Sequence, residues 1–170
     1  MLKKLQTVTL GCSKNKVDTE HILSQVEDLY EIIPEGEDIP VDVLLINTCG
    51  FIGDAKEESI QAVLEGVDRK SRGEVGKVIV FGCLSQRYAS EMPELIPEVD
   101  AWFGAREFDP VIRELGAEPS EEKRTERYLT TPSHYAYLKI SEGCDRRCSY
   151  CAIPFIRGAH KSVPMEHLVA

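Results

Sequence analysis

Short hydrophobic runs along this chain alternate with longer segments in which hydrophobic residues recur every three or four positions. A continuous short hydrophobic run is typical of a buried strand in a parallel sheet, and the longer period is typical of a helix packed on that sheet. The alternation predicts an α/β domain with a parallel sheet. The predicted strands are 5–10, 30–33, 41–46, 77–81 and 101–105, and the predicted helices are 16–30, 54–70, 86–95 and 109–115.

The helix ends carry their own signals. Ser13 or Asn15 is expected to cap the first helix, because short polar side chains accept hydrogen bonds from the free N–H groups of a helix start. The second helix has acidic residues in its first turn and basic residues in its last, which matches the helix dipole.

The pattern changes after the last predicted helix. Residues 118–132 are polar and charged without a sustained period, which is typical of a linker. A new strand is predicted at 136–140, followed by a cysteine-rich loop and a helix that begins at Pro164. These elements are too few to bury a core. We therefore expect residues 1–117 to form one domain and 133–170 to open a second.

Composition narrows the class of protein. The chain is 42% hydrophobic and 29% charged, as soluble globular proteins are, and its net charge of −9 argues against a general nucleic-acid surface. One basic cluster surrounds the cysteine loop (Arg146, Arg147, Arg157 and Lys161), either as a local binding patch or as a solvated loop. The N-terminal run is too polar for a signal peptide, and no stretch approaches the ~20 apolar residues of a membrane span. We expect a cytoplasmic protein.

Three of the six cysteines follow predicted strands: Cys12, Cys49 and Cys83. All strands of a parallel sheet end on one edge, where ligand sites of such sheets lie. These cysteines are therefore expected to converge, and thiolates near helix starts are good metal ligands. The alternative is three ordinary buried cysteines.

The other cysteines, Cys144, Cys148 and Cys151, lie in one short loop with the spacing C-x3-C-x2-C. Structural zinc requires four ligands, and only His160 offers a fourth. A cubane iron–sulfur cluster held by three thiolates keeps one iron open, and that iron can bind a small molecule. The spacing favours the cluster and leaves zinc as the alternative.

Four sequence stretches, each containing at least one of these cysteines, resemble a known family. They are "GCSKNKVDTE", "NTCGFIGDAKEES", "FGCLSQRY" and "EGCDRRCSYCAIPFIRG". Together they resemble the radical S-adenosylmethionine (SAM) methylthiotransferases. The resemblance implies a three-layer N-terminal methylthiotransferase domain followed by the start of a radical SAM (β/α) barrel. The segments "GCSKN" and "TCGFI" are similar to the RimO-like branch, which modifies an aspartate of the twelfth small-subunit ribosomal protein.

The resemblance also implies cofactors and roles. Cys144, Cys148 and Cys151 would hold a [4Fe-4S] cluster that cleaves SAM to a radical, with Tyr150 beside the SAM. Cys12, Cys49 and Cys83 would hold an auxiliary [4Fe-4S] cluster that carries the sulfur, and a second SAM would donate the methyl group. A flavodoxin or ferredoxin would supply electrons, and neither a membrane nor, for this segment, a nucleic-acid partner is expected.

Two departures from the family pattern qualify these expectations. Val163 stands where the family usually has an arginine, and most of the barrel lies outside this sequence. The chain alone is therefore not expected to complete the reaction. The alternatives are a tRNA methylthiotransferase of the MiaB-like branch and a non-catalytic iron–sulfur or zinc module.

Overall fold

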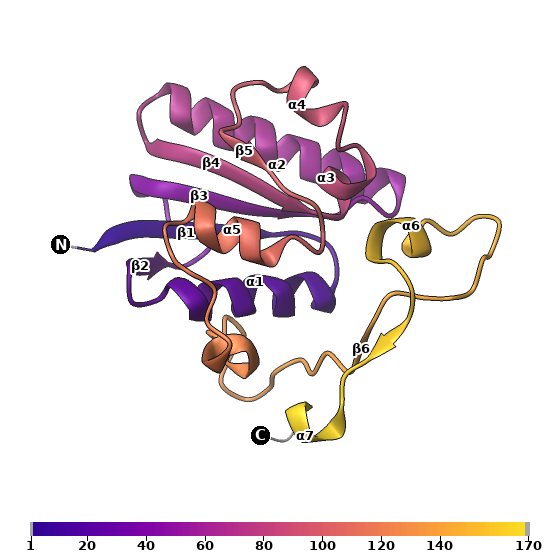
Figure 1. Cartoon of the computed structure of the whole chain (residues 1–170). Helices are drawn as coiled ribbons and strands as arrows, with labels where there is room; N and C mark the ends of the chain where they lie inside the picture. The colour runs from indigo at the N-terminus through magenta and orange to yellow at the C-terminus, as the bar shows by residue number, and fades with distance from the viewer. Residues whose placement is uncertain (1, 169–170) are drawn as a thin grey trace.

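A computed structural model describes residues 2–168, and its centre is a sheet of five parallel strands in the order β2-β1-β3-β4-β5 (Figure 1). The predicted α/β fold with a parallel sheet is confirmed. The strands are β1 (Lys3–Thr9), β2 (Tyr30–Ile33), β3 (Val41–Thr48), β4 (Val75–Gly82) and β5 (Ala101–Trp102).

Helices cover both faces of the sheet and make a three-layer arrangement. On one face, α1 (Ser13–Val26) and α5 (Phe108–Glu114) pack against the side chains of Val43, Leu45 and their neighbours. On the other face, α2 (Gly53–Ser71) packs against Leu44 and Ile46. Successive residues of β3 thus point to opposite faces, and both faces are buried, which explains why the run from Val43 to Ile46 is hydrophobic without interruption.

The predicted helix 86–95 is wrong, because the structure has two short helices there. They are α3 (Cys83–Arg87), which begins directly after β4, and α4 (Met92–Leu95). A continuous helix would place the ring of Pro93 against the carbonyl of residue 89 and lose a hydrogen bond. The chain therefore leaves helical geometry at Tyr88, and Pro93 lies in the first turn of α4, where a proline is tolerated.

The first helix also differs from its prediction. It ends at Val26 instead of 30, and its cap position is Cys12, with no hydrogen bond from a capping side chain. Ser13 and Asn15 both lie inside the helix, so neither is the cap. The side chain of Asn15 is fully buried and has other partners.

The segment predicted as a linker lies along α1. It contains a short 3-10 helix, η1 (Glu122–Thr125). The N–H of Tyr128 donates to the carbonyl of Glu20 (3.0 Å), and the carboxylate of Glu20 accepts from the N–H of Thr130 (2.9 Å). These contacts fix the path by which the chain leaves the sheet.

Residues 133–168 hold only small elements. The strand predicted at 136–140 is wrong, because none of these residues belongs to a strand; Leu138 and Ile140 are exposed. Instead, β6 (Ser141–Glu142) pairs antiparallel with β7 (Lys161–Ser162), and the short helices are α6 (Ile153–Arg157) and α7 (Met165–Leu168). The helix predicted after Pro164 is confirmed as α7. No (β/α) barrel is present within residues 2–168.

The helices described were compared with the requirements for a membrane-spanning helix. None of those in residues 2–168 combines the length and the apolar character that a bilayer span requires.

Asp100 ties the end of α2 to the sheet. Its carboxylate accepts from Lys70 Nζ (2.6 Å) and from the N–H of Val78 (2.8 Å). Burial raises the pKa of this carboxyl, but these two donors more than offset that effect and lower the pKa overall. A lowered pKa means that the folded state is stabilised by the ionised form.

We expect Asp100→Asn to lower the free energy of unfolding by about 1 kcal/mol at neutral pH, since it removes the charge and keeps an acceptor for Val78. The ionised Asp100 stabilises the fold fully above its unfolded pKa of about 3.9, and this contribution disappears as pH falls through the lower folded value. Urea denaturation from pH 7 to pH 2 measures the difference. The control is Asp38→Asn at an exposed carboxylate. A difference that grows below pH 4 would contradict this account.

Candidate functional site

The cysteines that follow β1, β3 and β4 meet at one edge of the sheet. These strands are neighbours in the sheet and run parallel, so their carboxyl ends lie together. A side chain built on Gly11 would place its Cβ 2.7 Å from Cβ and 2.9 Å from Sγ of Cys49. The loop carrying Cys12 therefore touches the loop carrying Cys49. We call Cys12, Cys49 and Cys83 the first cysteine trio.

Asn15, on the first turn of α1, connects Cys12 with Cys83. Its Oδ1 lies 3.9 Å from Sγ of Cys12 and 3.8 Å from Sγ of Cys83, close enough to accept weak hydrogen bonds from both thiols. Its Nδ2 donates to the carbonyls of Leu10 (2.8 Å) and Thr48 (3.3 Å). These two bonds fix the orientation of the amide, so the oxygen must face the sulfurs.

The three cysteines of the first trio differ in solvent exposure. Cys12 is exposed, Cys49 is half-buried and Cys83 is buried, and all three are free thiols. Burial raises the pKa of the Cys83 thiol, and the positive charge of the nearby Arg157 offsets only part of this rise. The site is therefore open to a ligand on one side and closed by the protein on the other.

Among residues 2–168, no group of three or more Cys, His, Asp or Glu side chains is arranged to hold a metal ion. The first trio still offers the chemistry of an iron–sulfur site, because cysteine thiolates are the usual protein ligands of such clusters. Three unpaired thiols from three loops, open to the surface at Cys12, match the thiolate ligands that such clusters take.

The other three cysteines, which we call the second cysteine trio, lie between β6 and α6. The loop is held by hydrogen bonds from the N–H of Cys144 to the carbonyl of Gly158 (3.0 Å) and from the N–H of Cys151 to the carbonyl of Cys148 (3.1 Å). Cys144 and Cys151 are half-buried, and Cys148 is exposed. Tyr150 is 88% exposed, so its ring is available for contact with another molecule.

His160, the fourth ligand that a zinc site would need, lies on the stretch that follows the second trio. Its backbone N–H is hydrogen-bonded to Asp145 Oδ1 at 2.9 Å.

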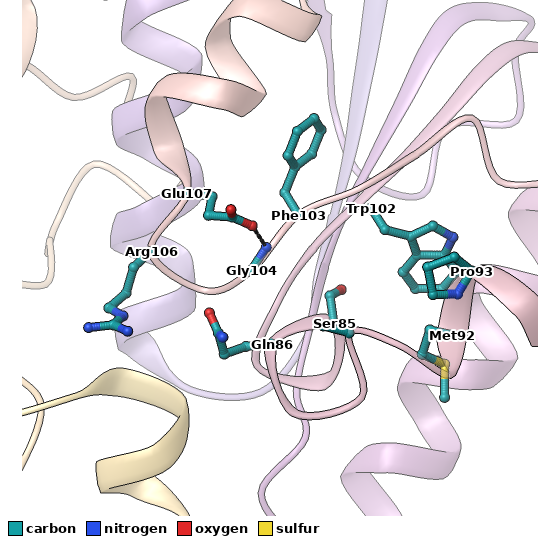
Figure 2. Close-up of a pocket in the computed structure, with 10 residues that line it drawn as sticks. Ser85, Gln86, Met92, Pro93, Trp102, Phe103, Gly104, Arg106 and Glu107 are labelled. Atoms are coloured by element: carbon teal, nitrogen blue, oxygen red, sulfur yellow. Dashed lines mark hydrogen bonds between the residues drawn. The ribbon is translucent and has the colours of Figure 1, made fainter.

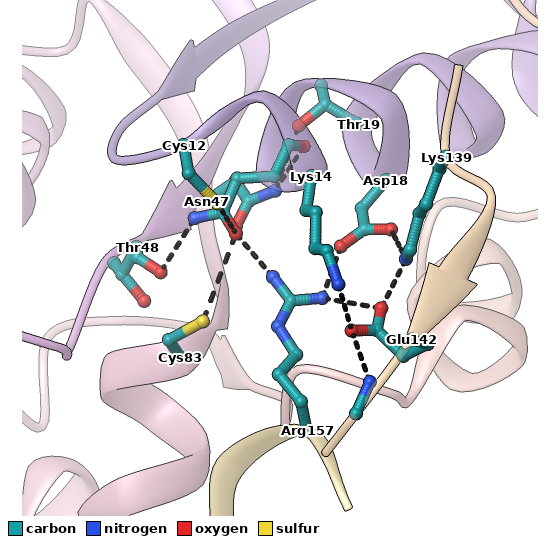
Figure 3. A network of polar contacts seen from close by, with 12 residues as sticks. Cys12, Lys14, Asp18, Thr19, Asn47, Thr48, Cys83, Lys139, Glu142 and Arg157 are labelled. Atoms are coloured by element: carbon teal, nitrogen blue, oxygen red, sulfur yellow. Dashed lines mark hydrogen bonds and ion pairs between the residues drawn. The ribbon is translucent and has the colours of Figure 1, made fainter. Parts of the chain in front are cut away.

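The basic cluster predicted around this loop is wrong for one member. Arg146, Arg147 and Lys161 are exposed, but Arg157 is only 5% exposed. It reaches from α6 toward α1 instead of toward solvent (Figure 3). Sequence reasoning grouped the four by charge and proximity along the chain, and neither property reports burial.

Arg157 is part of a polar network that the sequence did not indicate. Its Nη1 contacts Asp18 Oδ2 (2.6 Å) and Glu142 Oε2 (3.1 Å), and its Nη2 donates to Asn15 Oδ1 (Figure 3). Lys139 Nζ contacts Asp18 Oδ1 at 2.5 Å. Burial alone would lower the pKa of Arg157, but Asp18 and the other anionic partners raise it overall, so the guanidinium is always charged. The available signal was polar Asn15 and Asp18 on the inner side of an amphipathic helix.

A cavity shares helix α3 with the first cysteine trio but is separate from the cysteines. It has a volume of about 450 Å³ and lies between α3 and the segment after β5, with Ser85, Gln86 and Trp102 in its wall (Figure 2). None of the six cysteines lines it. Helix α3 is shared, because it begins at Cys83 and continues into the cavity wall.

Comparison with known proteins identifies the family. A family model described as "Uncharacterized protein family UPF0004" matches residues 4–104, which is more than half of the chain. The chain belongs to this family. The match covers β1 through β5 and all three members of the first cysteine trio.

Curated relatives of this chain carry a more specific name. The chain is 51% identical over 168 residues to "Ribosomal protein uS12 methylthiotransferase RimO" of Bacteroides thetaiotaomicron, and the alignment covers 98% of the chain and 38% of the relative. The proteins of the same name from Cytophaga hutchinsonii and Porphyromonas gingivalis are 51% and 48% identical over 167 residues, with 98% of the chain and 38% of each relative covered. The chain thus spans about two fifths of these relatives and is a RimO-like N-terminal portion, as the cysteine motifs predicted.

Gly11 gives a direct test of how closely the first trio is packed. Gly11 and Gly36 both have a positive φ, +91° and +88°, but only Gly11 has neighbours within 4 Å of an added Cβ. Each Gly→Ala change should cost about 1–2 kcal/mol for the left-handed backbone. We expect Gly11→Ala to cost about 1–3 kcal/mol more, because Cys49 must move. Urea denaturation of both variants measures this, and equal losses would show that the two loops are not in contact.

Proposed function

We propose that this chain is the N-terminal portion of a radical SAM methylthiotransferase that adds a methylthio group to the β-carbon of an aspartate in ribosomal protein uS12. The observation that carries the proposal is the pairing of two three-cysteine sites in a chain about half identical to relatives named for that reaction. We assign residues 1–117 to the auxiliary-cluster domain, 118–132 to a linker and 133–170 to the start of the radical SAM (β/α) barrel.

The residues that would hold the cofactors follow from the two sites. Cys12, Cys49 and Cys83 would hold the auxiliary [4Fe-4S] cluster, and Cys144, Cys148 and Cys151 would hold the radical SAM cluster. When bound, the clusters and SAM supply radical chemistry that removes a hydrogen from a carbon too weakly acidic for any side-chain base. Tyr150, exposed beside the second trio, would contact SAM.

The chain's own residues prepare these sites. In the metal-free chain Asn15 Oδ1 accepts weak hydrogen bonds from the thiols of Cys12 and Cys83, and burial of Cys83 keeps water from one side of that site. The second trio keeps one face open at Cys148, where SAM and an electron donor such as a flavodoxin or ferredoxin would approach. With a ribosomal protein as substrate, the reaction would take place in the cytoplasm.

We expect anaerobic reconstitution of this chain with iron and sulfide to load two clusters, or about eight irons. Cys12→Ser, Cys49→Ser and Cys83→Ser together should leave about four irons, and the same changes at Cys144, Cys148 and Cys151 should also leave about four. Iron and zinc analysis with Mössbauer spectra measures the outcome. Loss of all iron in either triple variant would show one shared site, and stoichiometric zinc without iron would exclude the radical reaction.

The reaction requires the remainder of the enzyme. We expect a polypeptide that joins residues 1–170 to the remaining part of the Bacteroides thetaiotaomicron relative to add a methylthio group to uS12 in the presence of SAM and a reductant. Peptide mass spectrometry measures it, with Cys12→Ser in the same polypeptide as the inactive control. Modification of tRNA and not of uS12 would show that the chain belongs to the tRNA-modifying branch instead. A cluster-loaded polypeptide that modifies neither would refute it.

A further inference from the structure

The helix that follows the second cysteine trio contributes a side chain to the first. Arg157 comes from α6, yet its guanidinium donates to Asn15, the residue whose oxygen faces Cys12 and Cys83. The same oxygen therefore faces a permanent positive charge and two thiols of the first trio. None of the cysteine motifs assigns Arg157 to that site.

The contact between Arg157 and α1 is buried and fully paired. Arg157 is 5% exposed, and its partners Asp18 and Asn15 on α1 are 2% and 0% exposed. Burying a charge is unfavourable unless it is paired and hydrogen-bonded, and Arg157 is both. Its planar fork binds Asp18 with one nitrogen and Asn15 with the other, a geometry that a lysine could not reproduce.

The charged groups around Arg157 give this polar network a net positive charge. Lys14 Nζ lies 3.7 Å from Glu142 Oε1, and Lys139 contacts both Asp18 and Glu142. Three cations and two carboxylates thus form one network, so its charge is positive by one. In a chain with a net charge of −9, this positive spot lies where thiolates would gather.

We propose that Arg157 is a positioning residue for the first cysteine trio, so that this site is completed only when residues 139–158 dock on α1. The fork fixes Asn15 and Asp18, and the charge stabilises the negative charge that a thiolate-bound cluster brings. The electrostatic part rests on the proposed function, whereas the docking part does not.

The docking part is tested on the metal-free chain by hydrogen–deuterium exchange and mass spectrometry. Arg157→Gln should speed exchange at least about tenfold in peptides from residues 139–158 and from residues 12–18, since breaking one side of a buried ion pair is strongly destabilising. Arg147→Gln, at an exposed arginine of the same loop, should leave both peptides unchanged within about twofold. Unchanged exchange at residues 12–18 in Arg157→Gln would overturn the proposal.

A conservative variant separates the fork from the charge. Arg157→Lys keeps the charge but contacts only one of Asn15 and Asp18, so exchange at residues 12–18 should lie between that of the unmodified chain and that of Arg157→Gln. If Arg157→Gln does not fold, as judged by circular dichroism, Arg157→Lys decides the matter. Exchange equal to that of the unmodified chain would then count against the fork and overturn the proposal.

The electrostatic part is tested by a reduction potential. In a chain with Cys144→Ser, Cys148→Ser and Cys151→Ser, any reconstituted cluster must lie at the first trio. Arg157→Gln should shift its potential to a lower value, because a nearby cation favours the more negative, reduced state, and Arg157→Lys should restore it. Equal potentials in all three proteins would remove the electrostatic role. Failure to bind any cluster would instead refute the proposed function, while the exchange result would still decide the docking.

Discussion

The buried amide of Asn15 is the interaction on which the rest of the site depends. A fully buried amide must find partners for its donor and its acceptor, and here the donor takes two carbonyls at the ends of β1 and β3. The acceptor then has one direction left, toward the sulfurs of Cys12 and Cys83 and the guanidinium of Arg157. A single side chain thereby joins strand ends, thiols and a distant helix.

The sheet supplies the frame for this arrangement. Because β1, β3 and β4 are adjacent and parallel, three loops far apart in sequence open on one edge. The two packed faces of β3 hold that edge in place. The second trio needs no such frame, since its cysteines share one loop, and its position depends on the contacts of α6 and residues 139–142 with α1.

Much of the fold follows from hydrophobic patterning, and the exceptions have physical causes. The strand at 41–46 and the helix at 54–70 were predictable because burial on both faces and on one face leaves distinct patterns. The break between α3 and α4 was missed because the hydrophobic period continues through it, whereas Pro93 prevents one continuous helix. The segment 136–140 has the composition of a strand but forms none. The convergence of Cys12, Cys49 and Cys83 was predictable because parallel strands end on one edge, whereas the sequence analysis made no prediction of the strand order. The Arg157 network was not, because a pattern of charges along a chain does not show which cation is buried.

The spacing of the two cysteine trios in sequence has a thermodynamic consequence. No two of Cys12, Cys49 and Cys83 are close along the chain, so the unfolded polypeptide offers no local site, and whatever binds there binds the folded form alone. Such binding stabilises the native state by its full mass-action term. The second trio keeps its three thiols close together even when the chain is unfolded, and binding there shifts the folding equilibrium less. A ligand bound at the first trio therefore stabilises the whole sheet, whereas a ligand bound at the second trio orders mainly its own loop.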